Sequence, residues 1–92
     1  MNLQTRIISS EGVISTEIEN EIVLMHIADG KYYALNSVGS IIWSQISTPV
    51  AISFLCERIT KEFDVEFDVC QRDVLSLVKE LHELGLIQVV EE

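Results

Sequence analysis

The stretch DGKYYALNSVGSIIW, Asp29 to Trp43, contains a turn, a strand with two tyrosines and the start of a helix. Its Asp29-Gly30 pair is a strong hairpin signal, because both central positions of a type I′ turn require positive φ. Residues Lys31–Leu35 are therefore predicted to form a strand that passes directly into a helix. Such a strand is expected at the edge of a sheet, where one row of its backbone N–H and C=O groups stays unpaired.

Two more strands are predicted before this turn. In VISTEIE, Val13 to Glu19, apolar and polar residues alternate, as in a strand with one solvated face. The stretch IVLMHI, Ile22 to Ile27, is more continuously apolar, which is typical of the central strand of a sheet. The segment Gln4–Ser9 is a further candidate for a short strand that flanks the other three.

The hydrophobic period becomes helical after Asn36. Asn36 or Ser37 is expected to cap a first helix, and Thr48 a second, with Pro49 at the first helical position. The residues that keep core spacing on these two helices are Val38, Ile41, Ile42 and Ile46, then Ile52, Leu55, Cys56, Ile59 and Phe63.

A third helix is predicted to open at Asp68, which forms a capping-box pattern with Gln71, and to end at Gly85. Its core stripe consists of Cys70, Val74, Leu77, Val78, Leu81 and Leu84. Three strands followed by three helices predict an α+β domain of winged-helix type over residues 1–92, with a three-stranded antiparallel sheet and a three-helix bundle.

Composition limits the functions that this chain can have. With 92 residues, 48% of them apolar, the chain can bury a single modest core. Six basic residues against fifteen acidic ones give a net charge of −9, which leaves no positive surface for a nucleic acid backbone. No apolar run reaches the about 20 residues that span a bilayer, and no signal peptide is present, so we expect a cytoplasmic protein without a membrane partner.

The sequence contains no recognisable catalytic or metal-binding motif. His26 and His82 have no nucleophile arranged beside them, and Cys56 and Cys70 lack metal-site spacing, which favours buried thiols. The acidic clusters lack the spacing of a calcium loop, and the four glycines are isolated rather than grouped in a phosphate loop. We therefore expect a protein that is not an enzyme and that needs no metal or cofactor.

The last predicted helix has a wider apolar stripe than its core face needs. Leu75 widens the stripe on one flank, while the opposite flank carries Asp73, Glu80 and Leu84. Leu75 either covers a loop or, with Val78, faces the edge strand across a groove in which an extended peptide could add a strand. The candidate peptide-binding residues are Lys31, Tyr32, Tyr33, Ala34, Leu35, Gln71, Leu75, Val78, Lys79 and His82.

The segment YYALNSVGSIIW, Tyr32 to Trp43, resembles the Leu-Asn-x-x-Gly-x-x-Ile-Trp motif of the family typified by the pyrroloquinoline quinone biosynthesis protein D. LVKELHELGLI, Leu77 to Ile87, is similar to the closing helix of that family, and the resemblance spans Val13 to Val90. It implies a recognition element for ribosomally made, modified peptides. Such an element would capture the leader segment of the precursor as an added strand between the third strand and the third helix.

A chain of this size without a fused enzyme most resembles the discrete leader-binding proteins of lasso-peptide pathways. The resemblance implies that it delivers the precursor to a separate cysteine protease. A peptide chaperone for a radical SAM maturase is the nearest alternative, followed by a winged-helix DNA regulator or a small structural subunit. An acidic leader would fit this acidic chain only if Lys31, Arg72 and Lys79 gather near the groove.

Overall fold

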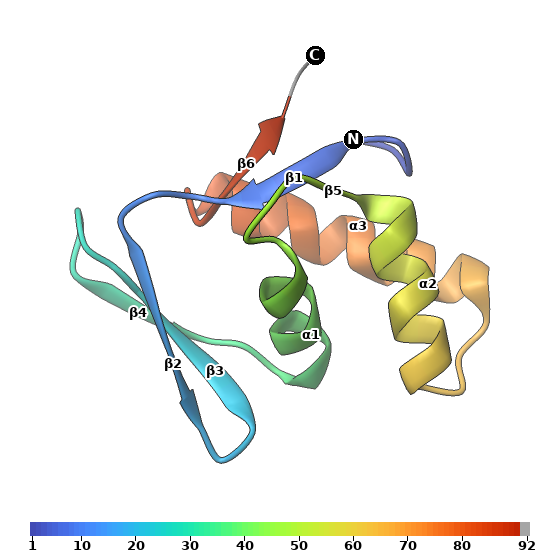
Figure 1. Ribbon diagram of the computed structural model, residues 1–92, viewed down its shortest axis with the longest axis horizontal. Coiled ribbons are helices and arrows are strands. Elements are labelled where there is room, and N and C mark those ends of the chain that lie inside the picture. The colour runs from blue at the N-terminus through green and yellow to red at the C-terminus, as the bar shows by residue number, and fades with distance from the viewer. Residues whose placement is uncertain (91–92) are drawn as a thin grey trace.

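The computed structural model describes residues 1–90, which form two small antiparallel sheets and three helices (Figure 1). Strands β2 (Val13–Ile18), β3 (Glu21–His26) and β4 (Lys31–Ala34) form one sheet with β3 in its centre. We call this sheet the meander. It confirms the predicted three-stranded antiparallel sheet and the central place of the strand that contains Ile22.

The two turns of the meander differ from the sequence prediction. Glu19 and Asn20 have φ values of 52° and 70°, so the turn between β2 and β3 has the φ signs of type I′. In the turn between β3 and β4, Gly30 has positive φ but Asp29 does not, and the Gly30 N–H donates to the carbonyl of His26. The predicted hairpin is present, but the type I′ turn predicted at Asp29-Gly30 is wrong.

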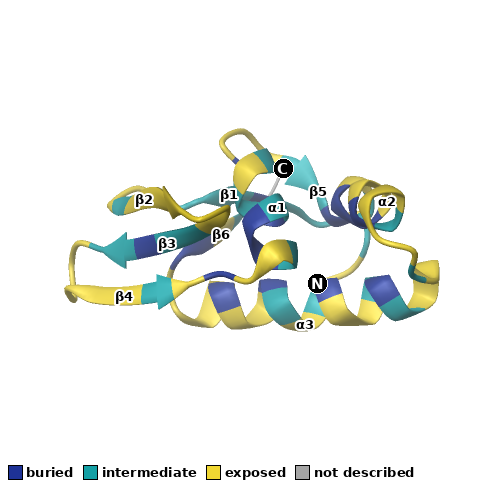
Figure 2. Ribbon diagram, turned by 90° about the horizontal axis from the view of Figure 1, so that it is seen from below, coloured by how far each residue is buried: buried dark blue, intermediate teal, exposed yellow. Residues whose placement is uncertain are grey.

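Three helices follow the meander: α1 (Ser37–Gln45), α2 (Ile52–Glu62) and α3 (Phe67–Glu83). Their buried residues are turned toward one another and toward the sheets (Figure 2). The buried core consists of Ile7, Leu24, Leu35, Ile42, Ile46, Ile52, Leu55, Cys56, Ile59, Cys70, Val74, Val78, Leu81, Leu86 and Ile87. The predicted α+β class of winged-helix type is confirmed. Of the helices described, none has the length and apolar character required to cross a bilayer.

The second sheet joins the two ends of the described chain. It contains β1 (Arg6–Ser9), β5 (Val50–Ala51) and β6 (Ile87–Val90), in the order β5-β1-β6. The sequence predicted a strand within Gln4–Ser9 but placed it beside the meander, whereas β1 pairs with β5 and β6. Strands β5 and β6 were not predicted. Because β6 packs against α3, the second sheet covers one side of that helix.

The start of α1 and the end of α3 are as predicted. The side-chain oxygen of Asn36 accepts a hydrogen bond from the N–H of Gly39 at 2.8 Å, which caps α1. At the end of α3, Gly85 has a φ of 77°, and the N–H of Leu86 donates to the carbonyl of Leu81 at 3.0 Å.

The starts of the other two helices differ from the predictions. Helix α2 begins at Ile52 because the two residues before it pair with β1, so Pro49 precedes β5 instead of opening the helix. Helix α3 begins at Phe67, so Asp68 lies inside its first turn and does not cap it. In both helices the preceding residue has an extended backbone and makes no capping hydrogen bond through its side chain.

Two predicted core residues are exposed. Phe63 has 36% of its surface exposed and Leu84 has 37%. Each is the C-terminal cap residue of its helix, where the backbone leaves the regular helical turn, so its side chain no longer continues the buried stripe. The remaining residues predicted for the stripes of α2 and α3 are buried or half-buried.

Candidate peptide-binding site

Strand β4 lies at the edge of the meander, because β3 is its only strand partner in the described part of the chain. The N–H of Leu35 donates to the carbonyl of Ile22 in β3 at 2.8 Å. Backbone groups alternate in an antiparallel ladder, so Tyr33 also directs its N–H and C=O toward β3. The N–H and C=O groups of Tyr32 and Ala34 therefore point away from the sheet, where an added strand could pair with them.

Ser40 fixes the place where β4 leaves the sheet. Its Oγ accepts a hydrogen bond from the N–H of Ile22 at 3.1 Å and lies 3.4 Å from the carbonyl of Leu35, to which it donates. The side chain thus bridges the last rung between β3 and β4 and ties the first turn of α1 to the meander. Ser40 is only 8% exposed, so these backbone groups have little access to water.

The turn before β4 is held by Asp29. Its Oδ1 accepts a hydrogen bond from the N–H of Lys31 at 3.0 Å and lies 3.2 Å from Nδ1 of His26. The backbone hydrogen bond from Lys31 is the main reason why the pKa of the Asp29 carboxyl is lowered, and His26 adds to it. The carboxylate therefore stays charged and fixes the start of the edge strand.

A pocket of about 340 Å³ lies where β4 leads into α1. Asn36 and Val38 form one wall, and the α3 residues Asp73, Ser76, Leu77 and Glu80 form the other. The end of α3 also approaches the meander, because a Cβ at Gly85 would lie 3.8 Å from Nε2 of His26. We call the free edge of β4 together with this pocket the edge groove.

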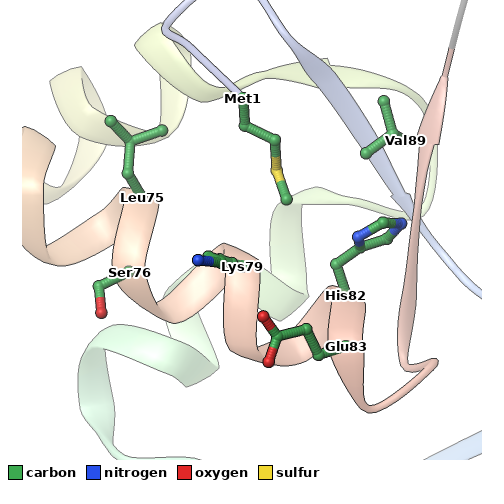
Figure 3. A pocket seen from close by; sticks show the side chains of 7 residues that line it. All are labelled: Met1, Leu75, Ser76, Lys79, His82, Glu83 and Val89. Atoms are coloured by element: carbon green, nitrogen blue, oxygen red, sulfur yellow. The ribbon is translucent and has the colours of Figure 1, made fainter.

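The α3 residues predicted for peptide binding lie elsewhere on the helix. Leu75, Lys79 and His82 line a second pocket, of about 610 Å³, with Val89 of β6. Figure 3 shows their side chains on the side of α3 that faces β6 and Met1, and no residue of β4 lines this pocket.

The other predicted residues have mixed positions. Val78 is fully buried in the core, and Gln71 is half-buried. Among the β4 residues, Tyr32 is 70% exposed, Tyr33 is half-buried, and Leu35 is only 5% exposed. The remaining two, Lys31 and Ala34, are exposed. The structure therefore brings Lys31–Leu35 together along one edge but does not bring Leu75, Lys79 or His82 to it.

Sequence reasoning missed the α3 residues of the edge groove. Asp73 and Glu80 were placed on the opposite flank of the helix, and Leu77 was placed in the core. Helical periodicity identifies two flanks but does not say which one faces the meander. That choice depends on β6, which occupies the flank of Leu75 and was not predicted.

The charges of the edge groove are negative on the α3 side. Asp73 and Glu80 line its pocket, and no lysine or arginine does. Lys31 is exposed at the start of β4, whereas Lys79 lines the pocket beside β6. The three predicted basic residues therefore do not all gather at this groove, because Lys79 lines the other pocket, and this gives no support to an acidic leader.

The two cysteines are buried between α2 and α3. The Sγ of Cys70 lies 3.7 Å from the carbonyl of Cys56. Burial raises the pKa of the Cys56 thiol to about 11, with a smaller effect from the neighbouring Cys70, and burial also raises the pKa of Cys70. Neither thiol is activated as a nucleophile at neutral pH. In residues 1–90, no group of three or more His, Cys, Asp or Glu side chains is arranged to hold a metal ion.

Comparisons with known proteins point to one family. The family model described as coenzyme PQQ synthesis protein D (PqqD) matches residues 21–87. The comparison with curated protein sequences finds no match.

Two solved structures are similar to this chain. The first is TbiB1 in complex with the TbiA(beta) leader peptide, with a TM-score of 0.83, 28% identity, and coverage of 92% of this chain and 99% of that one. The second is lasso peptide synthetase B1 complexed with the leader peptide, with a TM-score of 0.80, 22% identity, and coverage of 89% of this chain and 96% of that one. This second similarity supports the fold. Since the family model spans β3, β4, all three helices and the start of β6, this chain belongs to the PqqD family.

Proposed function

We propose that this chain is a non-catalytic adaptor that binds the leader segment of a ribosomally made precursor peptide by strand addition. The observation that carries the proposal is the free edge of β4, where Tyr32 and Ala34 direct their backbone groups outward beside a pocket. An extended peptide that pairs with such an edge gains main-chain hydrogen bonds, and adjacent pockets select its side chains. The similar structure of TbiB1 is a complex with a leader peptide, which supports this assignment.

The proposed pathway is lasso-peptide synthesis in the cytoplasm, in which the adaptor presents the leader to a separate protease. This proposal rests on the descriptions of the two similar structures, one of which is a lasso peptide synthetase B1. A chaperone for a radical SAM maturase also agrees with membership of the PqqD family, but neither similar structure supports it.

The proposed contacts are mainly backbone and apolar. Lys31–Leu35 provide the edge, and the side chain of Leu35 anchors it in the buried core. On α3, Leu77 and Glu80 border the edge groove. The sequence-based assignment uses a different set of α3 residues: Gln71, Leu75, Val78, Lys79 and His82. Since backbone pairing carries no net charge, we expect leader binding to depend only modestly on salt.

Leu77 and Leu75 form a matched pair that separates the two assignments. Both are half-buried on α3, and they line different pockets. We expect Leu77→Gln to weaken leader binding about fivefold, because a half-buried leucine contributes roughly 1 kcal/mol of apolar contact. Leu75→Gln should leave the affinity within about twofold.

The measurement is a fluorescence titration of each variant with synthetic, labelled leader peptides from candidate precursors. Circular dichroism before the titration checks that both variants are folded. If only Leu75→Gln weakens leader binding, the leader binds on the β6 side of α3 and the edge-groove assignment is wrong. If the unmodified protein binds no candidate leader, the adaptor function itself is refuted.

A further inference from the structure

The outer face of the meander, on the side away from α1, has an uncovered apolar surface. Nine large hydrophobic side chains are exposed in the described chain, and four of them gather here. They are Ile14 (52% exposed), Ile18 (56%), Ile27 (54%) and Tyr32 (70%). This clustering distinguishes the face from the scattered apolar residues that any soluble protein exposes.

Strand register places these side chains on one surface. Ile14 lies opposite Met25, and Met25 lies opposite Tyr32, so the three form one row across the meander. A second row consists of Thr16, Val23 and Ala34. Side chains alternate between the two faces of a strand, so Leu24, which is fully buried, points to the opposite side. We call the surface formed by Ile14, Thr16, Ile18, Glu21, Val23, Met25, Ile27, Tyr32 and Ala34 the outer face.

The fold leaves this surface open. Helix α1 packs against β3 (Figure 1), and Leu24 of β3 belongs to the same buried core as Ile42 of α1. The second sheet forms no ladder with the meander. Val23 and Met25 of the central strand are half-buried, while the large apolar side chains around them remain exposed.

The charges around the outer face disfavour a second copy of this chain as its occupant. Glu21 belongs to the face, and Glu19 lies beside it at the turn between β2 and β3. No residue of the outer face is a lysine or an arginine. Two copies, each with a net charge of −9, would bring like charges together across the contact. The negative charge of the outer face instead complements another protein whose apolar surface is bordered by lysine or arginine.

The outer face continues into the edge groove. Tyr32 and Ala34 direct their backbone groups toward the free edge and their side chains onto the outer face. A strand added to β4 would extend this face by every second residue of the peptide. A protein seated on the face would then contact the adaptor and the bound leader at the same time.

We propose that the outer face docks the enzyme that processes the bound precursor, through an apolar patch on that enzyme bordered by lysine or arginine. This inference rests on the proposed function, because it assigns the partner that receives the leader. Docking on the face leaves the free edge of β4 available, so the peptide and the enzyme bind together.

The test uses candidate leader proteases from the genome that encodes this chain, each purified separately, and measures their binding to the adaptor–leader complex by calorimetry. Ile14→Lys places a charge in the apolar row and should weaken protease binding at least about tenfold. Phe54→Lys is the matched control, because Phe54 is 44% exposed on α2, and it should change binding by less than about twofold. Both variants should bind the leader with unchanged affinity.

A second variant, Glu21→Lys, keeps every apolar side chain of the outer face and reverses its charge. It should weaken protease binding several-fold at low salt and less at high salt. Circular dichroism and the leader titration check the fold of each variant.

The outcomes separate this inference from the proposed function. The docking proposal is overturned if the protease does not bind, or if it binds the folded Ile14→Lys and Glu21→Lys variants as tightly as the unmodified protein. Either result leaves the proposal of leader binding intact. A dimer that Ile14→Lys dissociates also overturns the docking proposal, because the occupant is then a second copy. Failure of the unmodified protein to bind any leader refutes the proposed function instead.

Discussion

Replacing single backbone amides of β4 by esters tests strand addition most directly, because each ester deletes one N–H and keeps the side chain. Since Leu35 donates to Ile22, the ladder assigns the Tyr33 N–H to β3 and the Tyr32 N–H to solvent. The two esters differ by one position, but they remove hydrogen bonds of different kinds. An ester at Tyr32 should affect the leader, and one at Tyr33 should affect the fold.

The expected magnitudes follow from the energy of one hydrogen bond. A backbone hydrogen bond contributes about 1 kcal/mol, so the Tyr32 ester should weaken leader binding about fivefold. The same energy lost at Tyr33 should lower the urea midpoint by roughly 0.7 M, for an m value of about 1.5 kcal/mol/M. The Tyr32 ester should leave that midpoint nearly unchanged, because its N–H has no partner in the meander.

The assay combines urea unfolding with a titration of a labelled leader peptide for each semisynthetic protein. An ester at Ser15 is the control for the other edge of the meander. The N–H of Ile27 donates to the carbonyl of Gly12, so the alternation in β2 directs the Ser15 backbone outward. If the Ser15 ester weakens binding and the Tyr32 ester does not, the peptide adds to β2 and the edge-groove assignment fails.

Two further predictions concern the scaffold. Ser40→Ala should destabilise the protein by about 1–3 kcal/mol, because the N–H of Ile22 loses its buried acceptor. The control Ser44→Ala changes an exposed serine and should cost less than about 0.5 kcal/mol. Equal urea midpoints for the two variants would contradict the bridging role of Ser40. The pKa of the Cys56 thiol is raised to about 11 in the folded state. The protonated thiol therefore contributes stability below the pKa of the unfolded state, and this contribution is lost as the pH rises through about 11. Labelling of Cys56 by a thiol reagent at pH 8 should therefore follow the rate of unfolding, and rapid labelling of the folded protein would contradict this.

The meander could be predicted because its signals are local. Alternation in β2, a continuous apolar run in β3 and a turn pair before β4 all lie within single elements. The direct passage from β4 into α1 also predicted the edge, and the absence of another strand partner in the described chain confirms it. Even the misassigned turn type left the register of β3 and β4 intact, since Gly30 still provides the positive φ that this turn needs.

The second sheet could not be predicted in the same way. Its strands are two to four residues long, too short for a periodic pattern, and β1 pairs with residues near the opposite end of the chain. Pro49 illustrates the consequence: its local signal favours a helix start, but the pairing of β5 with β1 delays α2 to Ile52. The same missing sheet explains why Leu75 lines a different pocket from the one beside β4. Strand β6 packs against the flank of α3 that carries Leu75, whereas Leu77 lines the pocket where β4 leads into α1.

The two sheets therefore have different roles in the molecule. The second sheet ties both ends of the described chain to α2 and α3. The meander contributes only Leu24 to the buried core of the described chain, and Leu35 follows directly after β4. Because so few of its side chains are needed for the core, the meander keeps one edge and one face free. An edge binds through backbone hydrogen bonds in the plane of the sheet, and a face binds through side chains perpendicular to that plane. A peptide at the edge and a protein on the face would thus use different atoms of Tyr32 and Ala34, which allows both to be held at once.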